Sequence, residues 1–342
     1  MVQFQEQSWH IRDRFFLSGK YRAEVGRLNS RTEHEKGRNN SPGVAGEGFL
    51  ATLTSCRLCP RACGVNRLAG EKGFCRAGVR PRVALATLHH WEEPCLSGSR
   101  GSGAVFFSYC NLRCAFCQNY RISWQGRGRE MEIEDLTALF LDLQAQGAHN
   151  INLVSATPYT PMLVPALREA KKRGLKIPVV YNCNAYESLE SLRSLAGLVD
   201  IYLPDLKYID DGPARRYSQA PNYFSVATAA ILEMQRQVGI LTFDAAGLAR
   251  RGLLIRHLVL PGQAEAACRV LEWVKANLPR ETYLSIMAQY VPVWQAQRYP
   301  EINRRLTAAE YESVLEYFDA LGLENGFCQE LDAATTDYIP NF

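Results

Sequence analysis

The sequence has no long hydrophobic run. Nowhere in its 342 residues do about 18 apolar residues follow one another, the length that a membrane-spanning helix requires. The amino-terminal segment also lacks the apolar core of a signal peptide, and its acidic residues, Asp13, Glu24, Glu33 and Glu35, do not suit an organelle transit peptide. We therefore expect a cytoplasmic protein that has no membrane partner.

A strong charge of either sign is absent as well. The 39 Lys and Arg residues nearly balance the 35 Asp and Glu residues, which leaves a net charge of +4. Such a small excess does not favour binding to nucleic acid. The apolar fraction of 47% is that of an ordinary globular protein, and the length allows one large domain with a smaller appendage.

Cysteine, in contrast, is abundant. The chain has 11 cysteines, and most of them fall into two short groups, one before residue 76 and one around residue 114. Because we expect a reducing compartment, clustered thiols favour metal ligation over disulfide bonds.

Composition divides the chain into three parts. Residues 1–48 are polar and are interpreted as a partly disordered extension with one short helix around residues 12–25. Residues 49–103 hold the first cysteine group and form a cysteine-rich, metal-binding module. Residues 104–342 show a regular alternation of apolar runs and helix-length segments, and we expect a helix near the carboxy terminus.

The alternation predicts a barrel. Segments such as 133–143 place apolar residues at helical spacing, and the runs between them are rich in Val, Ile and Leu, as parallel strands buried on both faces are. The pattern predicts a partial (β/α)6 TIM-type barrel with an amino-terminal cysteine-rich module, and a doubly wound sheet is the alternative. In either fold, functional residues lie at the carboxyl ends of the strands. The runs are AVFFSY (104–109), INLVSA (151–156), IPVVYN (177–182), VDIYLPD (199–205), LLIRHLVL (253–260) and TYLSIMA (282–288).

The second cysteine group directly follows the first of these runs. In SYCNLRCAFCQNY, Cys110, Cys114 and Cys117 are three thiols where a closed iron–sulfur cluster has four. Three thiolates on a [4Fe–4S] cube leave one iron free to bind a substrate or cofactor, as an open zinc site does. The alternative is three buried or zinc-binding cysteines.

The motif CNLRCAFC after a first strand resembles the cysteine motif of radical SAM enzymes. This resemblance implies that S-adenosylmethionine (SAM) binds the open iron through its amino and carboxylate groups, with Phe116 near the adenine. One electron from the reduced cluster, supplied by a donor such as flavodoxin or ferredoxin, then cleaves the sulfonium C–S bond. The resulting 5′-deoxyadenosyl radical abstracts hydrogen from a substrate.

Further motifs resemble the radical SAM enzymes that activate pyruvate formate-lyase. They are QNY after the last cysteine, Asn-Cys-Asn at 182–184, Asp-Leu-Lys at 205–207, and Arg-His-Leu-Val-Leu-Pro-Gly from residue 256, together with HHWEEP, GSG and CRLCPRAC. Where those enzymes have Gly-Gly-Glu to bind the SAM ammonium, this chain has SATPY, whose hydroxyls can accept from it. The resemblance therefore implies cofactor contacts from Asn119, Ser155, Thr157, Asn182, Asn184, Asp205, Lys207 and His257.

The first cysteine group has the spacing C-x2-C-x3-C-x11-C. Four thiolates at such spacings can close a tetrahedral zinc site or hold a second iron–sulfur cluster. We slightly favour zinc, because a basic, glycine-rich loop separates the last two thiols. The predicted ligands are Cys56, Cys59, Cys63 and Cys75.

Other candidates are weaker. His89, His90, Glu92 and Glu93 in HHWEEP could bind a metal, but we favour a solvated or SAM-side loop. Gln289 and Tyr290, after the sixth run, are candidates to face the substrate.

Three functions compete. In the first, a partner protein presents a glycine, and the product is the stable radical of a glycyl-radical enzyme. In the second, a small molecule enters the barrel mouth and is modified. The third is a non-catalytic metal-binding scaffold, which requires the cysteines of residues 110–117 to be dispensable for SAM cleavage.

Overall fold

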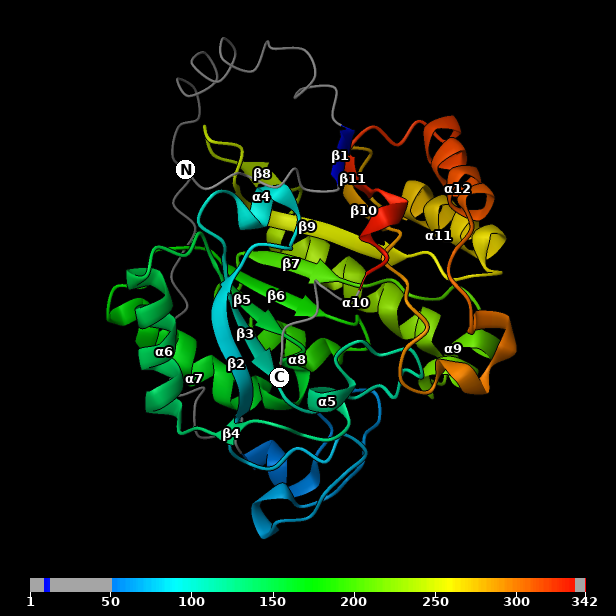
Figure 1. The fold of residues 1–342 in the computed structure, drawn as a ribbon. Coiled ribbons are helices and arrows are strands. Elements are labelled where there is room, and N and C mark those ends of the chain that lie inside the picture. The colour runs from blue at the N-terminus through cyan, green and yellow to red at the C-terminus, as the bar shows by residue number, and fades with distance from the viewer. Residues whose placement is uncertain (1–8, 13–50, 336–341) are drawn as a thin grey trace.

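The computed structural model describes residues 9–12, 51–335 and 342 (Figure 1). Of the extension predicted for residues 1–48, only Trp9–Arg12 is described, and it forms strand β1. The helix predicted around residues 12–25 lies outside the described residues. No described helix has the length and apolarity needed to cross a membrane.

The six predicted runs form six parallel strands that lie side by side in chain order. Because this order never reverses, the sheet has no topological switch point of the kind found in a doubly wound fold. The predicted partial (β/α)6 barrel is therefore confirmed, and the doubly wound alternative is wrong. The strands are β3 (Ser102–Phe107), β5 (Ile151–Val154), β6 (Val179–Cys183), β7 (Ile201–Pro204), β9 (Ala249–Leu258) and β10 (Tyr283–Met287).

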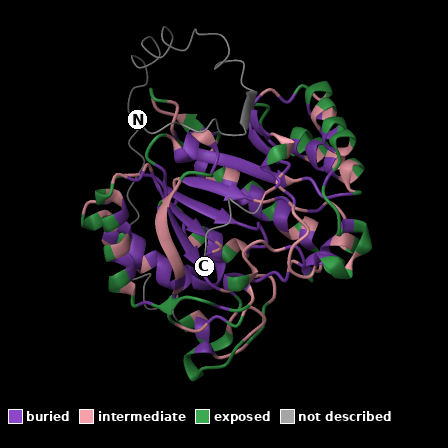
Figure 2. Ribbon diagram, in the orientation of Figure 1, coloured by how far each residue is buried: buried purple, intermediate pink, exposed green. Residues whose placement is uncertain are grey.

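Helices cover the convex face of this sheet (Figure 1). In the segment 133–143, Leu136, Phe140 and Leu143 are buried at the predicted helical spacing and pack in one core with strand residues such as Leu153. The strands themselves are buried almost throughout (Figure 2). The helices are α6 (Ile133–Ala145), α7 (Thr160–Lys172), α8 (Leu189–Ser194), α9 (Asp211–Ser218), α10 (Tyr223–Val238), α11 (Ala264–Asn277) and α12 (Ala308–Ala320).

Further strands extend the sheet beyond the barrel. On one side, β2 (Arg82–His89) pairs antiparallel with β3, and β4 (Arg129–Glu130) pairs with β2. On the other side, β11 (Gly326–Gln329) is parallel to β10, and β1 is antiparallel to β11. A short strand, β8 (Thr242–Phe243), pairs with β9. The described sheet thus ends in two edges, and the barrel is open.

A short helix covers part of the concave face. Cys95 and Leu96 of α4 (Pro94–Ser97) pack against Val180, Ile201 and Leu203 of the strands. A hydrophobic plug therefore fills one end of the barrel, and the other end, at the carboxyl ends of the strands, is left for a cavity.

The cysteine-rich module lies at that carboxyl end. Its chain contains two 3-10 turns, Ala51–Ser55 and Arg67–Ala69, and buries little apolar surface. The buried guanidinium of Arg67 donates to the carbonyl of Pro158 over 2.7 Å, which fixes the module to the loop after β5. Because β2 and α4 also fall within residues 49–103, the boundary between module and barrel stays a prediction.

Candidate active site

A cavity of about 240 Å³ opens at the carboxyl ends of the parallel strands. Residues that follow β3, β5, β6, β7 and β10 line it, together with Arg256 and Leu258 of β9 and residues of the HHWEEP segment. This is where a partial barrel is expected to hold its functional residues.

Three thiols stand in the wall of this cavity. The chain turns out of β3 at Tyr109, whose φ of 71° is rare for a residue with a side chain, and then enters the cysteine loop. Cys110, Cys114 and Cys117 all line the cavity and keep part of their surface open to it. Cys183 also reaches the wall from β6, but it packs in the core between sheet and helices.

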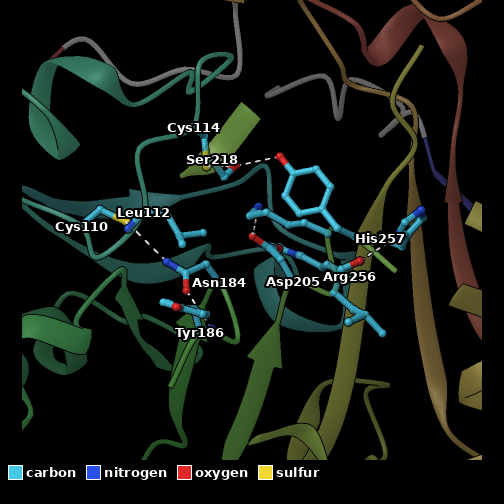
Figure 3. Close-up of polar contacts among 12 residues, drawn as sticks. Cys110, Leu112, Cys114, Asn184, Tyr186, Asp205, Ser218, Arg256 and His257 are labelled. Carbon is cyan, nitrogen blue, oxygen red and sulfur yellow. Dashed lines mark hydrogen bonds and ion pairs between the residues drawn. The ribbon is translucent and has the colours of Figure 1, made fainter. Parts of the chain in front are cut away.

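Each of the three sulfurs has a hydrogen-bonding neighbour. The amide of Asn184 donates to Cys110 Sγ over 3.3 Å, and the hydroxyl of Ser218 donates to Cys114 Sγ over 3.0 Å (Figure 3). Ser123 Oγ lies 3.2 Å from Cys117 Sγ. Such bonds orient thiolate ligands and tune the metal that they hold.

The three thiols fit the ligand set of a [4Fe–4S] cluster. Burial raises the pKa of Cys110 and of Cys114 to about 11, so each needs a metal to hold it as a thiolate. Such a cube takes one thiolate on each of three irons, which matches three partly open thiols in one loop.

The cysteine loop is fixed from both sides. Arg113 N donates to the carbonyl of Ser218, and Ala115 N donates to the carbonyl of Tyr217 over 2.7 Å. On the other side, the guanidinium of Arg61 donates to the carbonyl of Asn111 over 2.9 Å. The barrel and the cysteine-rich module therefore hold the loop together.

Asp205 and Lys207 face the cysteines across the cavity. Lys207 Nζ lies 2.6 Å from Asp205 Oδ2, and both side chains line the cavity (Figure 3). Burial disfavours the charged ammonium of Lys207, but the neighbouring carboxylate outweighs it and raises the pKa of Lys207. The ammonium of Lys207 is therefore held in its charged form beside Asp205.

Most of the other predicted cofactor contacts also line the cavity. Phe116 and Tyr290 pack with ring centroids 5.6 Å apart, and Gln289 lies beside them. Like Tyr109 after β3, Ser155 after β5 has a positive φ, of 60°. The sequence predictions placed at the cavity are Phe116, Asn119, Ser155, Asn182, Asn184, Asp205, Lys207, Gln289 and Tyr290.

Two residues predicted to contact the cofactor, Thr157 and His257, do not line this cavity. The buried hydroxyl of Thr157 donates to the carboxylate of Glu187 over 2.5 Å. His257 points away from the cysteines (Figure 3), and its Nδ1 lies 2.6 Å from the carbonyl of Leu206. Burial lowers the pKa of His257 to about 4, so its ring is neutral.

Glu187 yields a prediction about stability. Burial raises its pKa from 4.5 to about 8, so the folded chain prefers the neutral carboxyl. The stability that this carboxyl contributes is complete below pH 4.5 and is lost as pH rises toward 8. We expect the Tm of the wild type to fall between pH 5 and pH 8 by several degrees more than that of Glu187→Gln. Parallel thermal-unfolding profiles of the two proteins would contradict this expectation.

The sequence analysis did not predict the charged residues at one side of the cavity, Glu92 and Arg256, which we call the floor. Glu92 of HHWEEP and Arg256 of β9 line the cavity, and Arg256 also binds Glu93, which lies behind them. HHWEEP was expected to be a solvated or SAM-side loop; both carboxylates are buried, which excludes the solvated loop, and Glu92 lies at the cavity. An arginine inside the apolar run LLIRHLVL was the available signal, since a buried guanidinium requires a carboxylate partner.

The four thiols of the first cysteine group are neighbours within the module. Burial raises the pKa of Cys59 to about 12, and the nearby Cys75 raises it further. The backbone pairs Cys56 with Val65, and Phe74 N donates to Cys63 Sγ over 3.4 Å. All four cysteines are free thiols, so the metal at this group stays a prediction.

Comparison with known proteins identifies the family. Residues 104–274, half of the chain, match the Radical SAM superfamily. The chain is 31% identical over 277 residues to "Uncharacterized protein MJ0674" of Methanocaldococcus jannaschii, which covers 79% of this chain and 76% of that protein.

Solved structures with a similar fold are more distant. SuiB of Streptococcus suis, bound to SAM, is 15% identical with a TM-score of 0.46 over 66% of this chain, which spans 50% of that structure. A domain of a pyruvate-formate lyase-activating enzyme from Bacteroides vulgatus is 12% identical with a TM-score of 0.36, and the match covers 50% of this chain and 91% of that domain. The superfamily match covers half of the chain, and the three-cysteine loop follows β3 as described above. We conclude that the chain belongs to the radical SAM superfamily, whose members are enzymes that use a [4Fe–4S] cluster and SAM.

Proposed function

We propose that this chain binds SAM at a cluster held by Cys110, Cys114 and Cys117, cleaves it reductively, and takes hydrogen from a substrate in the cavity. The observation that carries the proposal is the position of the three thiols. They line one cavity at the carboxyl ends of the strands, opposite the ion pair of Asp205 and Lys207.

The bound group supplies the radical chemistry. A [4Fe–4S] cluster held by Cys110, Cys114 and Cys117 would supply one electron for reductive cleavage of the SAM C–S bond, with methionine as the leaving group, and would so provide a radical able to take a hydrogen atom from the substrate. The protein positions the reactants, since reacting atoms must be held in near-contact geometry.

The polar residues of the cavity suit a zwitterionic ligand. Lys207 offers an ammonium to a carboxylate, and Asp205 offers a carboxylate to an ammonium or hydroxyl. The amides of Asn182 and Asn184 add neutral donors and acceptors at the end of β6. Apolar residues, among them Phe116 and Met287, limit the access of water to a reactive radical.

Two substrate classes are compatible with this chemistry. The motifs around residues 182–184 and 205–207 resemble those of activating enzymes, which favours a glycine presented by a glycyl-radical enzyme. The buried charges of Glu92 and Arg256 at the cavity floor instead favour a small, charged molecule that enters the cavity.

The proposal is tested by SAM cleavage. The reconstituted chain, reduced anaerobically with dithionite, is expected to form 5′-deoxyadenosine and methionine in equal amounts. The same protein without the reductant is the control and should form neither product. Failure of the reduced, iron-loaded chain to bind or cleave SAM would favour a metal-binding scaffold and would refute the proposal.

Asp205 gives a second test. Asp205→Asn removes a charge-assisted contact and should weaken SAM binding roughly 10- to 100-fold while iron content stays at the wild-type value. Asp142→Asn on the exposed face of α6 is the matched control and should change neither quantity. Equal loss of iron and of SAM binding in Asp205→Asn would show that the carboxylate is part of a structural ion pair.

A further inference from the structure

The floor of the cavity contains two carboxylates for one guanidinium. Arg256 Nε lies 2.7 Å from Glu93 Oε1, and the terminal nitrogen of Arg256 contacts both Glu92 and Glu93. All three side chains are buried, with residue exposures of 0% for Glu93, 5% for Glu92 and 8% for Arg256. Glu93 thus accepts from Nε and from one terminal nitrogen of Arg256, and Glu92 shares that terminal nitrogen.

The charges at the floor do not balance. Burial opposes ionisation of Glu92, but Arg256 outweighs it and lowers the pKa of Glu92, which stays a carboxylate. The other cation among the described cavity residues, Lys207, is already paired with Asp205. Burial also lowers the pKa of His89, which lines the cavity near Glu92, so its ring is neutral. Two buried carboxyl groups therefore share one buried guanidinium, and a buried carboxylate without a full counter-charge is costly.

Unpaired acceptors flank this charge. Asn152 of β5 is fully buried, and its Nδ2 donates to Glu92 Oε1 over 2.8 Å, while its Oδ1 has no partner. Ser285 of β10 is also fully buried and lies in register with Arg256, and its hydroxyl has no partner. Buried polar groups in native proteins are nearly always paired, so these two atoms indicate a missing donor.

We propose that the part of this floor that lines the cavity, Glu92 and His89, binds a cationic group of the substrate, either a primary ammonium or a guanidinium. An ammonium offers three donors, which suit the carboxylate of Glu92, and Asn152 supports that carboxylate from behind. The inference rests on the proposed function and names the substrate class for the same cavity.

SAM also carries an ammonium, but Asp205 is the carboxylate that acts on the cysteine loop. The charge of Asp205 raises the pKa of Cys114, whereas Glu92 is not among the main influences on Cys110, Cys114 or Cys117. Because the proposed function gives Asp205 to SAM, Glu92 is left for the second reactant.

Binding of two molecules of the same shape tests the inference. The probes are phenethylammonium and the neutral 2-phenylethanol, titrated calorimetrically into the reconstituted, SAM-loaded chain. The wild type is expected to bind the ammonium at least 10-fold more tightly than the alcohol. Glu92→Gln is expected to lose this preference, while its SAM affinity and iron content stay unchanged. Glu92→Asp keeps the charge and should keep the preference, as should Glu134→Gln on exposed α6.

The other outcomes overturn the inference. Equal binding of the two probes to the wild type does so even if the variants do not fold. Weaker SAM binding by Glu92→Gln, with the probe preference intact, would assign the floor to the SAM ammonium. Because these are binding measurements, they are independent of SAM cleavage, and a wild type that prefers the ammonium but forms no 5′-deoxyadenosine would refute only the proposed function.

Discussion

Replacing Cys114 with alanine is expected to abolish the barrel cluster and with it the cleavage of SAM. The cube then has two protein ligands instead of three, so iron at this loop is lost and 5′-deoxyadenosine formation falls by at least about 1000-fold, which is roughly 4 kcal/mol in transition-state terms. The fold should persist because strands and helices pack through residues such as Leu153 and Phe140, which the substitution leaves in place. The measurements are iron and sulfide content, visible charge-transfer absorption and product formation.

Cys268 is the matched control for this variant. It lies on α11 and does not line the cavity, so Cys268→Ala should keep iron, absorption and product formation. If the triple alanine variant of Cys110, Cys114 and Cys117 binds as much iron per chain as the wild type, the assignment of the cluster to this loop is wrong.

Replacing Cys59 with serine is expected to remove the metal of the cysteine-rich module and to lower Tm by more than about 10 °C. The module buries few apolar side chains, Leu53, Leu58 and Ala77 among them, so metal binding has to supply much of its folding free energy. Cys268→Ser is the control for loss of a thiol. Metal analysis of protein purified without reconstitution and Tm by calorimetry are the measurements.

The same analysis distinguishes the two metals. We expect about one zinc per chain, lost in Cys59→Ser together with thermal stability, because a tetrahedral zinc site needs four thiolates. About eight irons per chain and no zinc would instead show a second cluster. In that case the variant would lose about half of its iron. A wild type with neither zinc nor extra iron would contradict both assignments.

The sequence predicted those parts of the site whose residues lie close together along the chain. The thiols of residues 110–117 lie within eight residues and directly after a strand, so their spacing and position were enough to place them at the cavity. Arg256 and Glu92 are 164 positions apart, and only the closure of the sheet brings them together. No spacing rule connects residues so distant.

Side-chain alternation could have indicated on which face of the sheet His257 lies. Arg256 and His257 are neighbours on β9, and successive side chains of a strand point to opposite faces. Once Arg256 faces the cavity, His257 cannot. Thr157 was placed by its position after β5, but it falls in the first turn of a 3-10 helix (Thr157–Tyr159), which directs its hydroxyl to Glu187.

Strand β2 was missed for a different reason. Its sequence, RVALATLH, alternates less regularly than an amphipathic strand. It also lies between the first cysteine group and HHWEEP, neither of which was expected to belong to the sheet. Its pairing with β3 is what carries HHWEEP across the concave face and places Glu92 in the cavity.

The central claim is that the cluster at residues 110–117 has one iron open to SAM. Electron paramagnetic resonance of the reduced Cys59→Ser variant, with and without SAM, tests it most directly, because only the barrel cluster then contributes a signal. We predict one [4Fe–4S] signal that shifts when SAM is added and that disappears when Cys114→Ala is combined with Cys59→Ser. A signal that is identical with and without SAM, or one that survives the loss of Cys114, would contradict the account.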